Sequence, residues 1–190
     1  MTLMMPIKKK LVLISIASIG ILVLAGLLVT TGLGAHGAGV IGPGIQISIT
    51  GSVDQTFNLT QNNSRARAIV TVTAELICVD GPSYGTHNWT GIRLSELLDE
   101  AGVQASAVKV GFHASDGYTT DLRLQDAARQ DVIIAFEKDG VPLKEKTRLI
   151  VPGMWGYKWI SGIDQIVLYD FDFKGKWESK GYSDDAIIGA

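Results

Sequence analysis

An uncharged stretch near the N-terminus constrains this chain more than any other feature. Residues 11–30 contain no Asp, Glu, Lys or Arg, and three lysines at positions 8–10 come directly before them. A run of this length matches the ~30 Å hydrocarbon core of a bilayer. The lysines favour the cytoplasmic side, and no further Lys or Arg occurs before Arg65. We therefore expect a cytoplasmic basic flank over residues 1–10, a transmembrane helix over residues 11–32, and an extracytoplasmic remainder.

A cleavable signal peptide is the alternative interpretation of the same stretch. The apolar run is long for a signal peptide, and the small residues at 34–38 form a weak cleavage site. We therefore predict an uncleaved, single-pass anchor. Residues 33–44 are rich in Gly and Ala and are expected to form a flexible tether. One domain then occupies residues 45–190.

The predicted domain is mildly acidic and contains a single cysteine. The first 34 residues hold three of the 17 basic residues and none of the 19 acidic ones, which leaves a net charge of −5 for the remainder. We expect no nucleic-acid partner, because such proteins present a basic face. Cys78 has no partner for an internal disulfide, so the domain must be stable through its hydrophobic core. A domain of about 150 residues can bury a sufficient core.

Hydrophobic periodicity predicts short strands with two short helices. A long loop rich in Gly, Pro and Asn is expected after residue 79, a polar loop over residues 61–67, and a tight hairpin turn over residues 114–118. The helices are predicted at residues 93–101 and 124–129, and the strands at residues 45–50, 57–60, 68–79, 107–113, 119–123, 131–138, 148–151 and 163–169. The βαβ alternation of a doubly wound fold is missing, so the predicted class is α+β with a mixed β-sheet.

Cys78 stands at the end of a strand that is predicted to be buried, directly before the turn signal Val79-Asp80-Gly81-Pro82. Loops held by rigid elements carry much protein chemistry, but a lone free cysteine is commonly a small buried hydrophobic residue. The chain has no Gly-rich phosphate loop, HExxH motif, CxxC pair or G-x-S-x-G elbow. Its three histidines do not cluster with acids at metal-ligand spacing. These patterns leave the role of Cys78 open.

Six separated segments follow one another in an informative order. They are Cys78; Trp89-Thr90-Gly91-Ile92 with Leu94, Leu97 and Leu98; Asp116-Gly117-Tyr118; Ala135-Phe136 with Asp139-Gly140 and Pro142-Leu143; Arg148-Leu149-Ile150-Val151-Pro152-Gly153; and Gly156-Tyr157-Lys158-Trp159. In order and spacing these segments resemble the molybdopterin-binding oxidoreductase domain of the sulfite oxidase type. The resemblance covers residues 46–169 and implies the mixed-sheet α+β fold of that family.

The resemblance also implies a set of cofactor contacts. In that family the strand-end cysteine supplies a thiolate to molybdenum, so Cys78 is the implied metal ligand of a molybdenum–molybdopterin cofactor; a soft thiolate suits such a metal. Arg148 and Lys158 match positions near the anionic pterin, and Tyr118 and His87 are further candidate contacts. Each has a simpler interpretation: a strand start for Arg148, a structural turn for Tyr118, and solvated side chains for Lys158 and His87.

Several positions depart from the family pattern. Val79-Asp80-Gly81 follows the cysteine where the family often has a basic residue, and Ser161 stands where the family has a second lysine. Residues 144–147 lack the usual Gly-Pro. Exported members of the family usually carry a twin-arginine signal, and residues 8–10 are lysines instead.

Two functions follow from this comparison. The first is a membrane-anchored, molybdopterin-dependent oxidoreductase domain that transfers oxygen atoms or electrons to a small oxyanion or sulfoxide-like substrate and works with an electron-transfer partner. The second is a cofactor-free extracytoplasmic binding or interaction module on the same fold. A Cys78 sulfur that faces an open cleft shared with Arg148 or Lys158 favours the first function, and a Cys78 sealed in the core favours the second.

Overall fold

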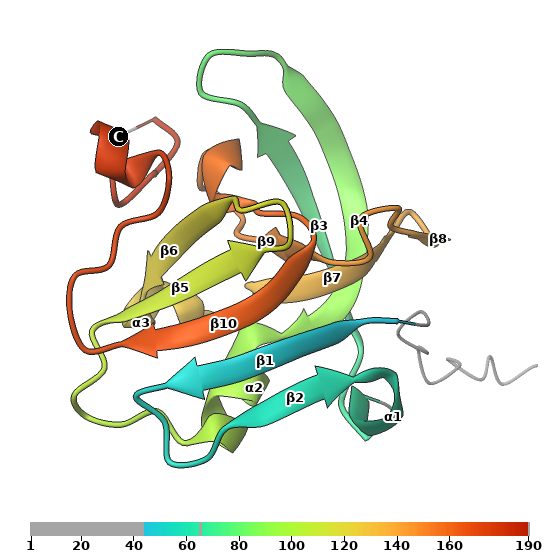
Figure 1. Ribbon diagram of the computed structural model, residues 1–190. Coiled ribbons are helices and arrows are strands. Elements are labelled where there is room, and N and C mark those ends of the chain that lie inside the picture. Colours follow the sequence, from blue (N-terminus) through green and yellow to red (C-terminus); the bar gives the residue numbers. More distant parts are fainter. Residues whose placement is uncertain (1–43, 65, 190) are drawn as a thin grey trace, which may run out of the picture. The chain divides into compact units, whose positions relative to one another are not determined.

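The computed structural model describes residues 44–64 and 66–189 (Figure 1). The predicted basic flank (1–10), the predicted transmembrane helix (11–32) and the predicted tether up to residue 43 lie outside these residues. Within the described ranges, no helix has the length and apolar character that crossing a membrane requires.

Two five-stranded sheets form the body of the domain. The first sheet has the order β2-β1-β10-β5-β6, and the second has the order β3-β4-β7-β8 with β9 also paired to β7. The strands are β1 Gln46–Gly51, β2 Phe57–Thr60, β3 Val70–Ile77, β4 Ser83–Arg93, β5 Lys109–Ala114, β6 Thr119–Arg123, β7 Ile133–Lys138, β8 Val141–Pro142, β9 Arg148–Ile150 and β10 Ile163–Tyr169. β1 and β10 are parallel, whereas β10 and β5 are antiparallel, so the first sheet is mixed, as the sequence predicts.

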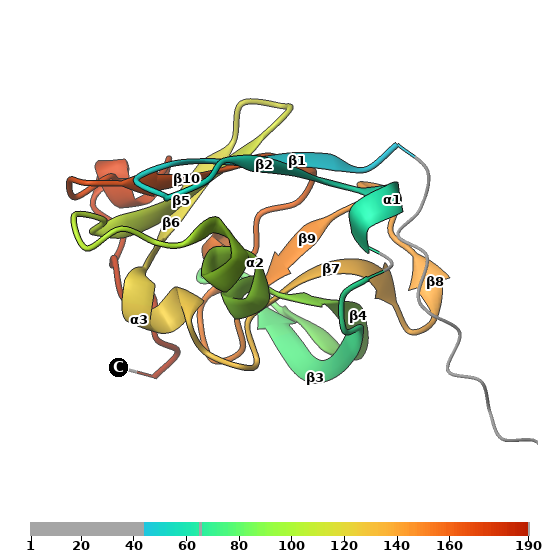
Figure 2. The same ribbon diagram turned by 90° about the horizontal axis from the view of Figure 1, so that it is seen from below.

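The hydrophobic core is one cluster to which both sheets contribute. In Figure 2 the first sheet is seen nearly edge-on, and the second sheet lies below it. α2 (Leu94–Ala101) follows β4 directly, buries Leu94, Leu97 and Leu98, and ends at Gly102 in the left-handed conformation. The other helical pieces are α1 Gln61–Ser64, α3 Leu124–Ala127, and the 3₁₀ turns η1 Gly156–Lys158 and η2 Glu178–Lys180.

Two expectations about the region around Cys78 are wrong. The strand predicted over residues 68–79 is β3, but Ala74 is its one buried residue, because β3 is an edge strand that pairs with β4 alone. The irregular loop expected after Cys78 is mostly β4, which is 11 residues long. β4 pairs with β3 on one side and with β7 on the other. This long-range pairing outweighs the local preference of Gly and Asn for loops.

The C-terminal segment, residues 171–189, is largely irregular, but hydrogen bonds attach it to β6. The Gly175 amide donates to Asp121 Oδ2 at 3.0 Å, and the Lys176 amide donates to the Thr119 carbonyl at 2.9 Å. β6 is the edge strand of the first sheet, so the C-terminal segment covers an edge that would otherwise expose unpaired backbone groups.

Replacing Gly91 with alanine tests how closely β4 approaches β7. A Cβ atom at Gly91 would lie 2.2 Å from the Ile134 carbonyl oxygen and 2.7 Å from the Ala135 Cα. We expect Gly91→Ala to lower the free energy of unfolding by about 3 kcal/mol, because backbone atoms must move. The control is Thr90→Ala, which removes one hydroxyl contact to Thr71 at 3.1 Å and should cost about 0.5 kcal/mol. Urea unfolding measures both values, and equal stabilities of the two variants would contradict the prediction.

Candidate functional site

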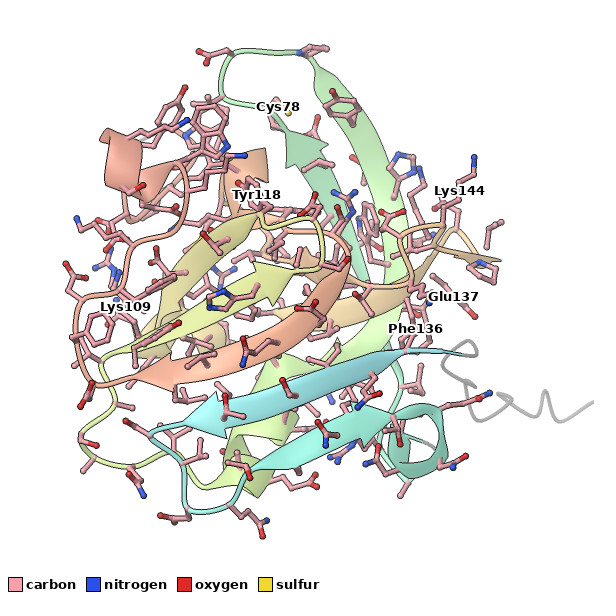
Figure 3. All side chains as sticks on the ribbon, in the orientation of Figure 1. Cys78, Lys109, Tyr118, Phe136, Glu137 and Lys144 are labelled. Atoms are coloured by element: carbon pink, nitrogen blue, oxygen red, sulfur yellow. The ribbon has the colours of Figure 1, made fainter. Side chains whose placement is uncertain are left out.

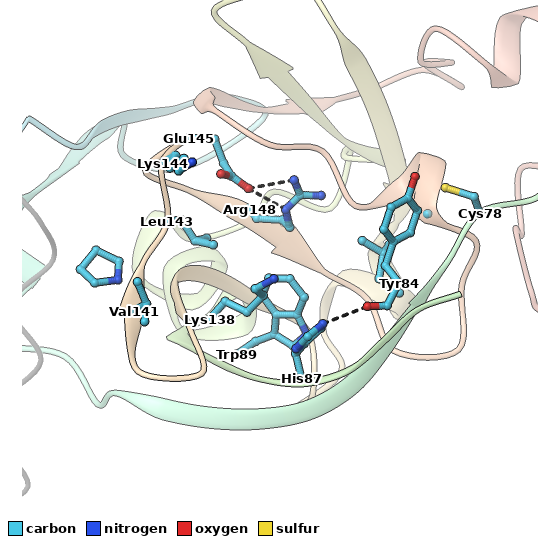
Figure 4. A pocket seen from close by; sticks show the side chains of 13 residues that line it. Cys78, Tyr84, His87, Trp89, Lys138, Val141, Leu143, Lys144, Glu145 and Arg148 are labelled. Carbon is cyan, nitrogen blue, oxygen red and sulfur yellow. Dashed lines mark hydrogen bonds and ion pairs between the residues drawn. The ribbon is translucent and has the colours of Figure 1, made fainter. Parts of the chain in front are cut away.

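A cavity of about 610 Å³ opens beside the end of β3. Its walls come from β3, β4, the β7–β8 hairpin, the segment before β9, and η1 (Figure 4). The residues that line it are Leu76, Cys78, Tyr84, His87, Trp89, Lys138, Val141, Pro142, Leu143, Lys144, Glu145, Arg148 and Gly156. Of the five predicted cofactor contacts, the structure therefore brings Cys78, His87 and Arg148 to one cavity. It does not bring Tyr118 or Lys158 there.

Cys78 follows β3 directly and is a free, partly exposed thiol. The backbone of Gly156, at the start of η1, packs against it. A Cβ atom at Gly156 would lie 3.0 Å from the Ile77 carbonyl oxygen and 3.5 Å from Cys78 Sγ. The thiol therefore lies on the wall of an open cavity, with Gly156 beside it.

Arg148 begins β9 and turns its guanidinium group toward Glu145. Its Nε and Nη2 donate to Glu145 Oε1 at 3.0 and 2.8 Å, and its Nη1 donates to the Trp159 carbonyl at 3.3 Å. Burial alone would raise the pKa of Glu145, but hydrogen bonds from its own backbone amide and from Arg148 outweigh burial and lower it. Arg148 is thus a fixed and already paired cation of the cavity wall.

Two further lysines, which sequence analysis did not single out, also line the cavity. Lys138 ends β7, and Lys144 follows the β8 hairpin. Within the described part of the chain, neither has a carboxylate within 4.0 Å. Lys144 belongs to the segment that departs from the family's Gly-Pro. The folding of the β7–β8 hairpin thus brings two lysines to the cavity.

His87 lies on β4, with neither ring nitrogen left unbonded. Its Nδ1 is 2.6 Å from Asp139 Oδ2, and its Nε2 is 2.9 Å from the Tyr84 carbonyl oxygen. The ring also packs edge-on against Trp89, with centroids 5.9 Å apart. Two hydrogen bonds to Asp139 lower the pKa of its carboxyl group. The bond from the Asn88 amide has the larger effect, and the bond from His87 has the next largest. His87 is thus a structural link between β4 and the β7–β8 turn, not the solvated loop residue of the simpler interpretation.

Tyr118 lies at the β5–β6 turn (Figure 3) and does not line the Cys78 cavity. Its hydroxyl donates to the Tyr157 carbonyl at 2.6 Å, and burial is the main reason that its pKa is raised. It lines a smaller cavity of about 240 Å³, which shares Gly156 with the first. The contact that Tyr118 makes in this structure is therefore with the backbone of η1.

Lys158 is fully buried, so the expectation of a solvated side chain is wrong. Its Nζ lies 2.7 Å from Glu178 Oε1, and it donates to the Asp121 carbonyl at 2.9 Å. Asp121 Oδ1 is 3.5 Å away and Asp184 Oδ1 is 3.8 Å away. Sequence analysis missed these acids because Glu178 and Asp184 belong to a tail without a regular pattern. Lys158 is part of an internal ion cluster with Asp121, Glu178 and Asp184.

The cavity residues suit a ligand that carries both a thiophilic metal and an anionic group. The volume falls within the roughly 300–1,000 Å³ of small-molecule sites. Cys78 offers a sulfur atom, the donor type that soft metals prefer. Lys138 and Lys144 offer ammonium groups for an anion, and Leu76, Leu143 and Trp89 offer apolar surface. A molybdenum–molybdopterin cofactor has this combination of properties, so the residues present fit it.

Comparisons with known proteins point in the same direction. The match to an uncharacterized oxidoreductase, YuiH, of Bacillus subtilis is 27% identical over 143 residues and covers 72% of this chain and 71% of that protein. Mitochondrial sulfite oxidase of Drosophila melanogaster is 30% identical over 163 residues, covering 70% of this chain and 28% of that protein. A putative protein-methionine-sulfoxide reductase subunit, YedZ1, of Azospira oryzae is 25% identical, covering 73% of this chain and 54% of that protein.

The fold has a counterpart among solved structures. The crystal structure of the sulfane dehydrogenase SoxCD from Paracoccus pantotrophus superposes with a TM-score of 0.60 at 23% identity, covering 66% of this chain and 38% of that chain. This likeness concerns the fold. The model of the family described as "Oxidoreductase molybdopterin binding domain" matches residues 43–177, more than half of the sequence. The chain therefore belongs to the molybdopterin-binding oxidoreductase family of the sulfite oxidase type.

Proposed function

We propose that this domain binds a molybdenum–molybdopterin cofactor in the Cys78 cavity and acts as an oxidoreductase on a small oxyanion or sulfoxide-like substrate, with an electron-transfer partner. The observation that carries the proposal is one open cavity that contains a free thiol together with Lys138, Lys144 and Arg148. When bound, such a cofactor supplies oxygen-atom or electron transfer, while the protein sets its orientation and surroundings.

Each cavity residue has a role that follows from its contacts. Cys78 would hold the metal through its thiolate. Lys144 and Lys138 would bind the anionic end of the cofactor as point charges. Arg148 is fixed by Glu145 and would orient a bound group without changing its own position. Trp89 is buried and would exclude water from its part of the cavity wall.

The substrate class is supported by two relatives. The Drosophila protein is a sulfite oxidase, and the Azospira protein is a putative protein-methionine-sulfoxide reductase subunit. The chain spans about a quarter of the first relative and about half of the second. Their substrates therefore support an oxyanion or sulfoxide for this domain without selecting between them.

A cofactor-free binding module is the second candidate. The observation that favours it is that two of the residues predicted to contact the cofactor already form ion pairs with acidic residues of the same chain. Arg148 is bonded to Glu145, and Lys158 to Glu178. A cation that is already paired gains less from an added anion. The metal content of the protein separates the two candidates.

Molybdenum content is the direct test of the proposal. We expect about one molybdenum per full-length chain purified from a host that makes molybdopterin, and at least a roughly tenfold loss in Cys78→Ser, because the metal loses its protein ligand. Elemental mass spectrometry measures both. The control is Ser106→Ala, an exposed position outside the cavity. Absence of molybdenum from the wild-type protein would overturn the proposal in favour of the binding module.

A pair of nearby lysines tests the anion-binding role. Lys144 lines the Cys78 cavity, whereas the Lys146 Nζ donates to the Gly44 carbonyl at 3.3 Å. We expect Lys144→Ala to reduce cofactor retention during dialysis by about tenfold, because a charge-assisted hydrogen bond is lost. Lys146→Ala should retain the cofactor like the wild type. Equal retention by the two variants would exclude a specific role for Lys144.

We also propose that residues 11–32 anchor the domain in the membrane with the N-terminus in the cytoplasm. The support is the uncharged run and the lysines before it. The full chain should stay with membranes after carbonate washing and dissolve in detergent. A chain that starts at residue 35 should be recovered in the soluble fraction. Release of the full chain by carbonate would contradict the anchor.

A further inference from the structure

The C-terminal segment, residues 171–189, contacts the surroundings of Cys78 from two sides. The family match ends at residue 177, so Glu178 and everything after it lie beyond the matched domain. These residues are nevertheless attached by hydrogen bonds and ion pairs to η1 and to the loop after Cys78. Both attachment points adjoin the thiol.

The first attachment is to η1, which packs against Cys78 through Gly156. The Lys158 ammonium at the end of η1 is paired with Glu178 at 2.7 Å, and both side chains are buried. The Thr120 hydroxyl donates to the same Glu178 oxygen at 2.7 Å. Glu178 thus joins η1 to β6, and a buried carboxylate in such a position tolerates little displacement.

Further bonds hold the same turn. The Tyr157 hydroxyl donates to the Ser183 carbonyl at 2.6 Å, and the Tyr157 ring packs edge-on against Tyr182 with centroids 5.4 Å apart. Just before η1, the Trp155 amide donates to the Ala186 carbonyl at 2.8 Å. Trp155 and Tyr157, the two neighbours of Gly156, are thus both hydrogen-bonded to the C-terminal segment.

The second attachment is to the other side of the thiol. The Tyr182 hydroxyl lies 3.4 Å from Asp80 Oδ2, and Asp80 is two residues after Cys78. The Gly81 amide donates to the Cys78 carbonyl at 3.4 Å. The C-terminal segment therefore connects the turn on one side of Cys78 to the loop on its other side.

We propose that the C-terminal segment positions Cys78, and that Glu178 is the principal positioning residue. By holding η1 against the end of β3, Glu178 fixes the wall that sets the orientation and accessibility of the Cys78 thiol. The inference rests on the proposed function, in which this thiol holds the metal. The position of the thiol is nevertheless measurable in protein without cofactor.

The chain itself provides a selective probe, because Cys78 is its one cysteine. The full-length chain is produced in a host that cannot make molybdopterin, and the rate of alkylation by iodoacetamide is measured well below the unfolding temperature. Two variants loosen the segment: Glu178→Gln removes the charge that pairs with Lys158, and Tyr157→Phe removes one hydroxyl bond while keeping the ring. Tyr169→Phe is the matched control, because it loses a hydroxyl contact to His113 at 3.0 Å on the first sheet.

We expect both variants to alkylate about fivefold faster than the wild type, because local opening becomes easier by the loss of one bond. The control should react at the wild-type rate. A merely structural role would lower the unfolding temperature without changing this native-state rate, so rates within about twofold of the wild type in both variants would overturn the proposal. If Glu178→Gln does not fold, Tyr157→Phe decides alone. Molybdenum content, measured separately on loaded protein, tests the proposed function and leaves this result unaffected.

Discussion

A cluster of buried charges joins β5, β6, η1 and the C-terminal segment, and much of the structure depends on it. Lys109 is paired with Asp121 at 2.9 Å and with Asp184 at 2.6 Å, and Lys158 with Glu178 at 2.7 Å. Burial raises the pKa of Asp121, although Lys158 and Lys109 act in the opposite direction. Burial alone would lower the pKa of Lys109, but Asp121 and Asp184 raise it. An ion buried without its partner costs several kcal/mol, so these elements must assemble together.

The cluster explains why η1 is fixed beside Cys78. Lys158 does not line the Cys78 cavity, because it is paired with acids on β6 and on the C-terminal segment. Its fixed position leaves the Gly156 backbone against the end of β3. η1 therefore contributes Gly156, and not Lys158, to the wall of the cavity. In this structure Lys158 is buried and paired with Glu178, and its predicted cofactor contact stays a prediction.

Charge in the cavity is supplied by a different route from the one the family pattern suggests. Arg148 is present but paired with Glu145. The cavity gains Lys138 and Lys144 from the two sides of the β7–β8 hairpin. A cavity that binds an anion needs positive charge at a place in space, and several sequence positions can provide it. The cavity therefore contains more basic residues than the family motifs in the sequence indicate.

The sequence alone determined the elements whose signals are local. The strands predicted at residues 57–60 and 163–169 agree with β2 and β10, and the helix before Gly102 agrees with α2, because side-chain periodicity and a glycine C-cap act over a few residues. The tertiary structure alone decided that residues 83–93 form β4, that Lys158 is buried, and that Lys144 reaches the cavity. Each of these depends on pairing with residues elsewhere in the chain, through strand pairing, ion pairing or hairpin closure, and a local sequence pattern does not identify such partners.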